Sequence, residues 1–297
     1  MALLALIAVT AVWGVTFVQV KDAVELYPLF AFLTVRYAIA TGALALVGGR
    51  RLLTLGRSGL AAGAVLGLLL GLGIGLQTAG LERTTVSSTG FITGLYVVLT
   101  PLFGLVLFRT RVGLEVWLGV GLSVAGLAML AGVHVGSTAG DLLVLASTAA
   151  QALQIVMVER YAPRYDAVAL TLVQMAACFV GFLVIALALG ELEVPRGWTV
   201  WGALVVTGVF ASALAYVIQI WAQRSLSAAR IALVFALETV VRSRPAVCSP
   251  IPRPSSRPST APAVKPERPS VRNRPPPAIA SAPVAIAYRT ARNANSG

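Results

Sequence analysis

Apolar blocks about as long as a lipid bilayer is thick fill this chain from its first residues to Val241. An α-helix rises about 1.5 Å per residue, so roughly 20 apolar residues cross the roughly 30 Å hydrocarbon layer. Eight complete blocks and a partial ninth from Ser227 to Val241 are present, the complete ones being approximately Ala2–Val20, Leu29–Gly48, Gly59–Leu81, Thr85–Phe108, Gly113–Gly132, Gly140–Val158, Ala167–Gly190 and Thr199–Trp221. The pattern predicts an all-α, polytopic transmembrane helical bundle.

Composition and charge agree with a membrane protein. The 297 residues are 58% hydrophobic and 11% charged, whereas soluble domains carry about 25% charged residues. The net charge of +12 is concentrated after Val241, where ten Lys or Arg residues face one acidic residue, Glu267. Because the rest of the chain is close to neutral, we expect a lipid bilayer and no nucleic acid as its surroundings.

The arginine distribution predicts an orientation. Lys and Arg favour cytoplasmic loops, and placing the N-terminus inside puts nine of them in inner loops, against Lys21, Arg83 and Arg196 in outer ones. The first block has no basic segment before it and no cleavage site after it, so we interpret it as a retained span. The expected location is the cell membrane, with a cytoplasmic N-terminus.

The segment after Val241 differs in composition from the rest of the chain. It holds twelve of the sixteen prolines, interleaved with Arg, Ser and Ala, and such sequence is expected to be disordered because it cannot bury a core. One interpretation is a basic tail that touches anionic lipid. The interpretation we favour is an out-of-frame extension, because the ninth block stops after 15 residues, or about 22 Å, short of a full crossing.

Several segments together resemble the EamA-type drug/metabolite transporters. They are Trp13–Val18, Lys21, Arg36, Phe91–Pro101 and Ala232–Glu238. The resemblance implies ten spans in two five-helix repeats of opposite orientation, with both termini cytoplasmic. Leu95–Thr100 aligns without gaps on Leu233–Glu238, with two identities in six positions.

The implied domains are a first repeat at 1–132, a second repeat at 139–241 and a disordered tail at 242–297. The second repeat is incomplete, since Thr239 stands where the family has a proline and the tenth span is missing. The resemblance implies secondary transport, with export of a small metabolite, amino acid or drug by alternating access. A non-transporting membrane protein or a nonfunctional remnant is the alternative, and homodimer formation stays open.

Polar side chains inside the spans are the candidate substrate-binding residues, because charges and amides in hydrocarbon need partners. The full set is Trp13, Arg36, Tyr37, Gln77, Tyr96, Gln151, Gln154, Tyr216, Gln219 and Glu238. Arg36 lies about 12 Å into its span, where it either attracts an anion or is satisfied structurally. The glutamines either line a translocation cavity or form hydrogen bonds that hold helices together.

Two further features concern packing. Gly63, Gly67, Gly71 and Gly75 recur every four residues and place a smooth stripe on one helix face, against which another helix can approach closely. Pro101 leaves a carbonyl without its helical partner, which produces a kink that is either static or a gate.

Enzymatic activity is not expected. The chain has a single histidine, His134, so no histidine metal pair or His-based triad can form. A Gly-x-Ser-x-Gly elbow and a nucleotide-binding loop are also absent from the sequence. The sequence therefore predicts neither a cofactor nor a metal site.

Overall fold

Every element in the described part of the chain is helical. The computed structural model describes residues 1–110, 112–131 and 139–237. The α-helices there are α1 Ala2–Leu26, α2 Leu29–Gly48, α3 Gly56–Leu81, α4 Val86–Gly94, α5 Tyr96–Phe108, α6 Leu114–Ala131, α7 Ala139–Tyr161, α8 Ala167–Leu189, α9 Trp198–Val206, α10 Ala215–Ala222 and α11 Ala228–Phe235. The 3₁₀ segments η1 Gly49–Thr54 and η2 Ala162–Arg164 and the π-helix η3 Thr207–Leu214 complete them.

Seven helical stretches among these residues are long and apolar enough to cross a membrane, which confirms an all-helical, multi-pass chain. The predicted count of eight full spans and a partial ninth is not confirmed. The block predicted at Gly113–Gly132 is helix α6, whose apolar stretch Leu114–Gly126 is shorter than a span. Glu238, His134 and the segment 242–297 lie outside the described residues.

Local sequence explains the helix ends. Asp166 caps α8, because its Oδ1 accepts hydrogen bonds from the backbone N–H groups of Val168 and Ala169 at 3.1 and 3.0 Å. Gly190 ends the same helix in the left-handed region at φ 67°, which glycine adopts without steric cost. Thr85 caps α4 through Ser88. These caps fix where neighbouring spans turn.

One predicted span is divided. Helix α4 ends at Gly94 and α5 begins at Tyr96, so the interruption falls at Leu95, while Pro101 lies inside α5. Leu95 accepts two hydrogen bonds at its carbonyl, from Val98 and Leu99. The structure therefore places the change of helical geometry six residues before the proline.

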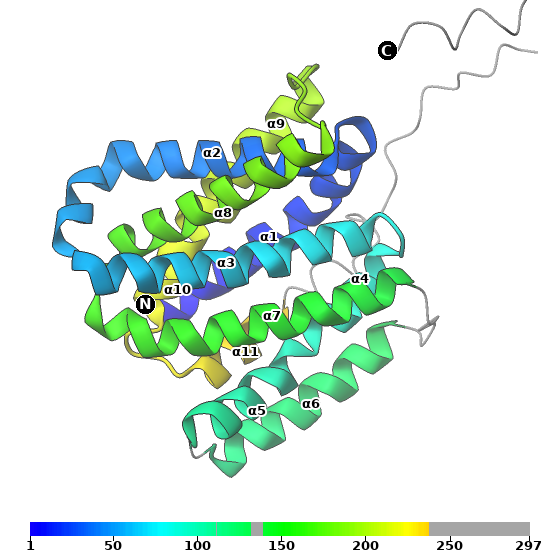
Figure 1. Cartoon of the computed structure of the whole chain (residues 1–297). Coiled ribbons are helices and arrows are strands. Elements are labelled where there is room, and N and C mark those ends of the chain that lie inside the picture. The colour runs from blue at the N-terminus through cyan, green and yellow to red at the C-terminus, as the bar shows by residue number, and fades with distance from the viewer. Residues whose placement is uncertain (111, 132–138, 238–297) are drawn as a thin grey trace, which may run out of the picture. The chain divides into compact units, whose positions relative to one another are not determined.

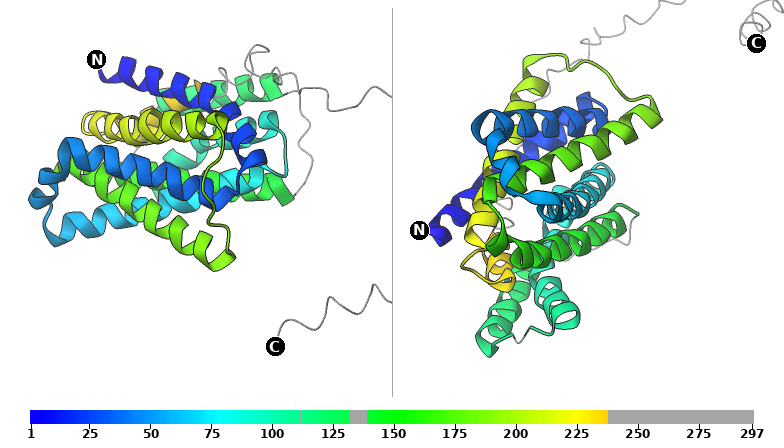
Figure 2. Two further views of the ribbon diagram at one scale, coloured as in Figure 1. Left: turned by 90° about the horizontal axis from the view of Figure 1, so that it is seen from above. Right: turned by 60° about the vertical axis from the view of Figure 1, so that its left-hand side comes forward.

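Helix α3 lies between two neighbours. It packs against α7 on one side and α8 on the other, and α8 in turn packs against α2. Figure 1 shows α3 running between α8 and α7, and the right-hand view of Figure 2 shows the same order, with α5 and α6 beyond α7. Elements of residues 1–131 and 139–237 therefore interleave.

Large apolar side chains stay exposed on the outside of the helices. Leu46, Leu122 and Met129 are 90%, 77% and 86% exposed. A soluble protein would bury most such surface. In a chain with seven apolar spans, this surface faces lipid.

Candidate functional site

Eight of the ten predicted cavity residues line a single internal cavity. They are Trp13, Arg36, Gln77, Tyr96, Gln151, Gln154, Tyr216 and Gln219. The cavity has a volume of about 70 Å³ and is bounded by α1, α2, α3, α5, α7, α10 and α11. A buried water needs about 10–15 Å³ by this measure, so the cavity has room for several waters or a small solute.

Arg36 is the charged member of the described cavity lining. Its side chain is 7% exposed, and its Nε donates a hydrogen bond to Ser212 Oγ at 2.9 Å. The guanidinium carbon lies 5.6 Å from the centroid of the Tyr37 ring. The ion pair found in the described residues joins Arg51 and Asp166, so no described carboxylate neutralises Arg36.

Glutamines of α7 and α10 form a partly satisfied network in the cavity lining, which continues to Gln223. Gln219 Nε2 donates to Gln154 Oε1 and Gln223 Oε1, both at 3.2 Å. Gln223 Nε2 donates to the carbonyl of Ile155 at 2.8 Å. The Nε2 atoms of Gln151 and Gln154 and the Oε1 atom of Gln219 have no partner in the described protein. Buried amides are normally hydrogen-bonded, so these three atoms are unsatisfied in this arrangement, as are both amide atoms of Gln174, which does not line the cavity.

Gln77 is a further amide of the cavity lining. Gln77 Nε2 donates to Thr93 Oγ1 at 3.1 Å, which links α3 to α4. This contact is of the interhelical type that holds membrane helices together. Both predicted uses of the glutamines, cavity lining and helix-to-helix bonding, are therefore visible in the geometry.

Aromatic rings form part of the remaining surface, together with aliphatic side chains and two threonines. The Trp13 ring centroid lies 5.5 Å from that of Tyr216 and 4.9 Å from that of Phe235, the second pair being edge-to-face. Tyr96 meets Phe235 at 6.5 Å. Rings in such arrangements attract one another beyond the effect of burial. Tyr37 does not line the cavity, because its ring packs against Phe182 at 5.4 Å in the apolar core.

The π-helix η3 supports both Trp13 and Arg36. The indole Nε1 of Trp13 donates to the carbonyl of Ala211 at 2.7 Å, and Ser212 of the same segment binds Arg36. A π-helix forms i→i+5 hydrogen bonds and occurs often at functional sites. Ser212 and Gln223 were not among the predicted residues, since neither periodicity nor a motif distinguishes them, and Phe235 lies in the resembling segment Ala232–Glu238 but was not predicted to line the cavity.

The glycine stripe of α3 faces α8. A Cβ at Gly63 would lie 2.7 Å from Val173, and one at Gly67 would lie 2.5 Å from the backbone oxygen of Gln174. At Gly71 and Gly75 the nearest atoms, of Cys178 and Phe182, are farther away, at 3.7 and 3.2 Å. The two helices thus touch most closely near Gly63 and Gly67 and separate toward Gly75, where an apolar groove of about 320 Å³ opens.

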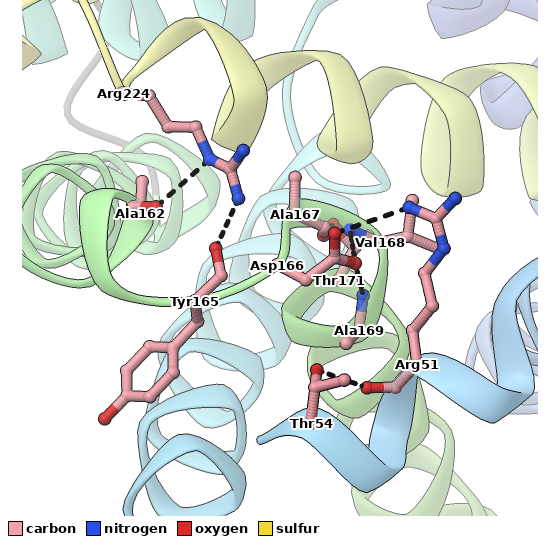
Figure 3. Close-up of polar contacts among 10 residues, drawn as sticks. All are labelled: Arg51, Thr54, Ala162, Tyr165, Asp166, Ala167, Val168, Ala169, Thr171 and Arg224. Carbon is pink, nitrogen blue, oxygen red and sulfur yellow. Dashed lines mark hydrogen bonds and ion pairs between the residues drawn. The ribbon is translucent and has the colours of Figure 1, made fainter.

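At one end of the bundle, arginine side chains connect neighbouring segments through hydrogen bonds and an ion pair (Figure 3). Arg224 donates from Nε to the carbonyl of Ala162 at 3.3 Å and from Nη2 to that of Tyr165 at 2.5 Å. Arg51 pairs with Asp166 at 3.3 Å. These contacts tie the segments at 49–54, 162–166 and 223–227 together.

The other end holds a polar cavity of about 520 Å³, lined by Glu25, Glu82, Arg83 and Glu191 among others. Glu191 accepts a hydrogen bond from the backbone N–H of Phe30 at 3.2 Å. Burial raises the pKa of Glu82, the charge of Glu191 raises it further, and Arg83 opposes both. Burial, followed by the charge of Glu193, raises the pKa of Tyr27, whose hydroxyl donates to the Glu193 carbonyl.

Known proteins match this chain along most of its length. The model of the EamA-like transporter family matches residues 1–132 and 138–242. An uncharacterized transporter of Archaeoglobus fulgidus is 31% identical over 241 residues, which are 80% of this chain and 74% of the relative. A solved crystal structure, 20% identical, superposes with a TM-score of 0.63 over 81% of this chain and 85% of that one, and it supports the fold alone.

Proposed function

Because the chain belongs to the EamA-like transporter family, we propose that it is a secondary transporter that exports a small metabolite, amino acid or drug by alternating access. It is a multi-pass membrane protein. The family and the relative favour transport over catalysis. The proposed location is the cell membrane, with the N-terminus in the cytoplasm.

The observation that carries this proposal is a cavity within apolar helices whose lining includes Arg36 and four glutamines. It is built by α1, α2, α3 and α5 from residues 1–131 and by α7, α10 and α11 from residues 139–237. Polar groups in hydrocarbon are costly and mark substrate pathways. In secondary transporters built from repeats, the substrate site lies between the two repeats near the bilayer midplane.

The packing supports two repeats related by a two-fold operation, one at 1–132 and one at 139–241. If α1 corresponds to α7 and α3 to the α9–α10 stretch, the pairing of α3 with α7 has its counterpart in that of α1 with α9 and α10. The pairing of α5 with α7 likewise has its counterpart in that of α1 with α11. Helices α2 and α8 pair with each other, as do α5 and α11.

Alternating access would use the two ends of the bundle. The arginine contacts among 49–54, 162–166 and 223–227 would close the cytoplasmic end, where arginines are expected to concentrate. The acidic cavity around Glu82 and Glu191 would be the outer vestibule. Breaking the arginine contacts at the cytoplasmic end and closing the acidic cavity at the outer end would expose the central cavity to the cytoplasm.

The alternative is a membrane protein that does not transport, in which the glutamines serve packing only. The Gln77–Thr93 bond and the Gln154–Gln219–Gln223 network favour it, because they join neighbouring helices and segments. The shared cavity favours the transporter, because it gathers Arg36 and four glutamines at one place within apolar helices, and polar groups in hydrocarbon mark substrate pathways.

Transport by the full chain in proteoliposomes tests the proposal. Efflux and counterflow of a radiolabelled panel of amino acids, organic acids and amines would be measured with and without a pH gradient. We expect at least one solute to move, with Gln154→Met slowing it and Gly42→Ala, which adds a methyl to open space, leaving it unchanged. If no solute moves faster than in protein-free vesicles, the non-transporting alternative holds.

A further inference from the structure

We infer that the central cavity selects solutes that carry a single carboxylate, with Arg36 as the residue that binds it. This inference rests on the proposed function, because it names the class of substrate for the same cavity. Arg36 is the charged residue in the described lining, and it lies within α2, a predicted span.

The contacts of Arg36 hold it in place without neutralising it. Ser212 binds Nε, and a guanidinium offers five N–H donors in a planar fork. Its terminal nitrogens are not paired with a carboxylate in residues 1–110, 112–131 and 139–237. A charge at this depth is stabilised only by a counter-charge or a wet cavity. A bound anion would supply the counter-charge.

Among the amides of the cavity lining, the buried atoms without a partner include more donors than acceptors, and a carboxylate would reach them once these side chains turn toward it. The Nε2 atoms of Gln151 and Gln154 are partnerless donors, against one partnerless acceptor, Gln219 Oε1. An ionised carboxylate accepts hydrogen bonds at two oxygens and donates none. Bonds between such a group and charged or amide donors are among the strong ones. An amine donates hydrogen bonds and carries a positive charge. It would therefore find few acceptors among these amides and would be repelled by Arg36.

The single positive charge sets the charge of the ligand. A phosphate monoester carries about −1.5 to −2 at neutral pH, so one arginine would leave excess negative charge in a buried site. Burying an uncompensated charge is expensive. A monocarboxylate leaves none. The rings of Trp13, Tyr96 and Tyr216 would pack against its carbon chain, and the volume of about 70 Å³ favours a short one.

The test uses four ligands of nearly equal size and different charge: butyrate, butyramide, butylamine and methyl phosphate. Their binding to the full chain in lipid nanodiscs would be measured by isothermal titration calorimetry. We expect butyrate to bind about tenfold or more tightly than the other three, as charge-assisted hydrogen bonds predict. Arg36→Gln should remove this preference, and Arg36→Lys should keep part of it because the charge remains. Arg57→Gln, at an exposed position on α3, is the matched control and should bind as the unaltered chain does.

Three results would overturn the inference. They are equal binding of the four ligands, a butyrate preference that persists in Arg36→Gln, and a preference that arises only after Glu238→Gln. The last would mean that Arg36 is neutralised inside the chain. If Arg36→Gln does not fold, the comparison of Arg36→Lys with the unaltered chain decides.

Transport assays separate this inference from the proposed function. Transport restricted to amines or neutral solutes would leave the transporter proposal standing and remove the carboxylate site. Selective butyrate binding without transport of any solute would support the carboxylate site and remove the transporter proposal.

Discussion

The two long interfaces of α3 and the wall of the central cavity are built on opposite principles. Along α3, glycines bring backbones so close that no Cβ fits at Gly67 or Gly80, where it would lie 2.5 to 2.8 Å from backbone oxygens. Around the cavity, long side chains such as Gln151 and Gln154 leave hydrogen-bonding atoms unused. The first region leaves no space for an added methyl group at these glycines, whereas the second encloses a cavity of about 70 Å³ lined by long polar side chains.

This difference indicates a division of labour. Close packing of small residues is what stabilises helix association in lipid, where the hydrophobic effect between helices is absent. A cavity lined by an arginine and several amides adds no such packing, and polar groups in hydrocarbon are costly. We therefore expect substitutions along α3 to change folding and substitutions at the cavity to change binding.

The largest expected effect is at the closest contact of α3. Gly67→Ala places a methyl 2.5 Å from the backbone oxygen of Gln174 and 2.6 Å from Ala177 Cβ, and overpacking of this kind costs about 1–3 kcal/mol. Unfolding in detergent would measure it. The control Gly42→Ala meets nothing within 4 Å and should be neutral or stabilising by up to about 1 kcal/mol. Equal stability of the two variants would mean that the close approach at Gly67 leaves room for a methyl group, contrary to the proposed contrast between the α3 interfaces and the cavity.

A smaller effect is expected where the connections meet. Arg224→Gln removes the bonds to the carbonyls of Ala162 and Tyr165. Because the arginine is largely exposed, the loss should be about 1 kcal/mol. Limited proteolysis should show faster cleavage within 162–166. Unchanged cleavage would mean that helix packing alone holds this end.

At the cavity wall, stability should barely change. Gln154→Met removes a partnerless Nε2 and the acceptor of one bond, while Gln219 Nε2 keeps its bond to Gln223. The free energy of unfolding should therefore change by less than about 1 kcal/mol, and butyrate affinity should fall. A destabilisation as large as that of Gly67→Ala would erase the distinction between the two regions.

The smallest effect is a pH dependence at the outer end of α3. The pKa of Glu82 is raised above its ordinary value of 4.5 by burial and by Glu191, so ionisation above pH 4.5 favours the unfolded chain. Glu82→Gln should match the unaltered chain below pH 4.5 and have the higher Tm near pH 7. A Tm difference that is constant with pH would contradict this.

Sequence reasoning found the helical class and the seven long spans because length and hydrophobicity alone identify them. Gln77, Gln151, Gln154 and Gln219 were recognised as candidates because amides are rare in hydrocarbon. The division at Leu95, the π-helix at Thr207–Leu214 and the role of Ser212 were not predicted. Each depends on backbone hydrogen bonding or on a partner far along the chain, and neither has a sequence signal here.

The amino-acid sequence alone places this chain in a lipid bilayer and among the EamA-like transporters, because span length, hydrophobicity and motifs are local properties. What the tertiary structure decided is which polar residues meet: eight candidates line one cavity, whereas Tyr37 packs in the apolar core. The physical reason is that lipid and the interior of a membrane protein are both apolar. Hydrophobic periodicity therefore does not mark the inward face of a membrane helix as it does in water, and only helix packing brings Arg36 of α2 to Ser212 of η3.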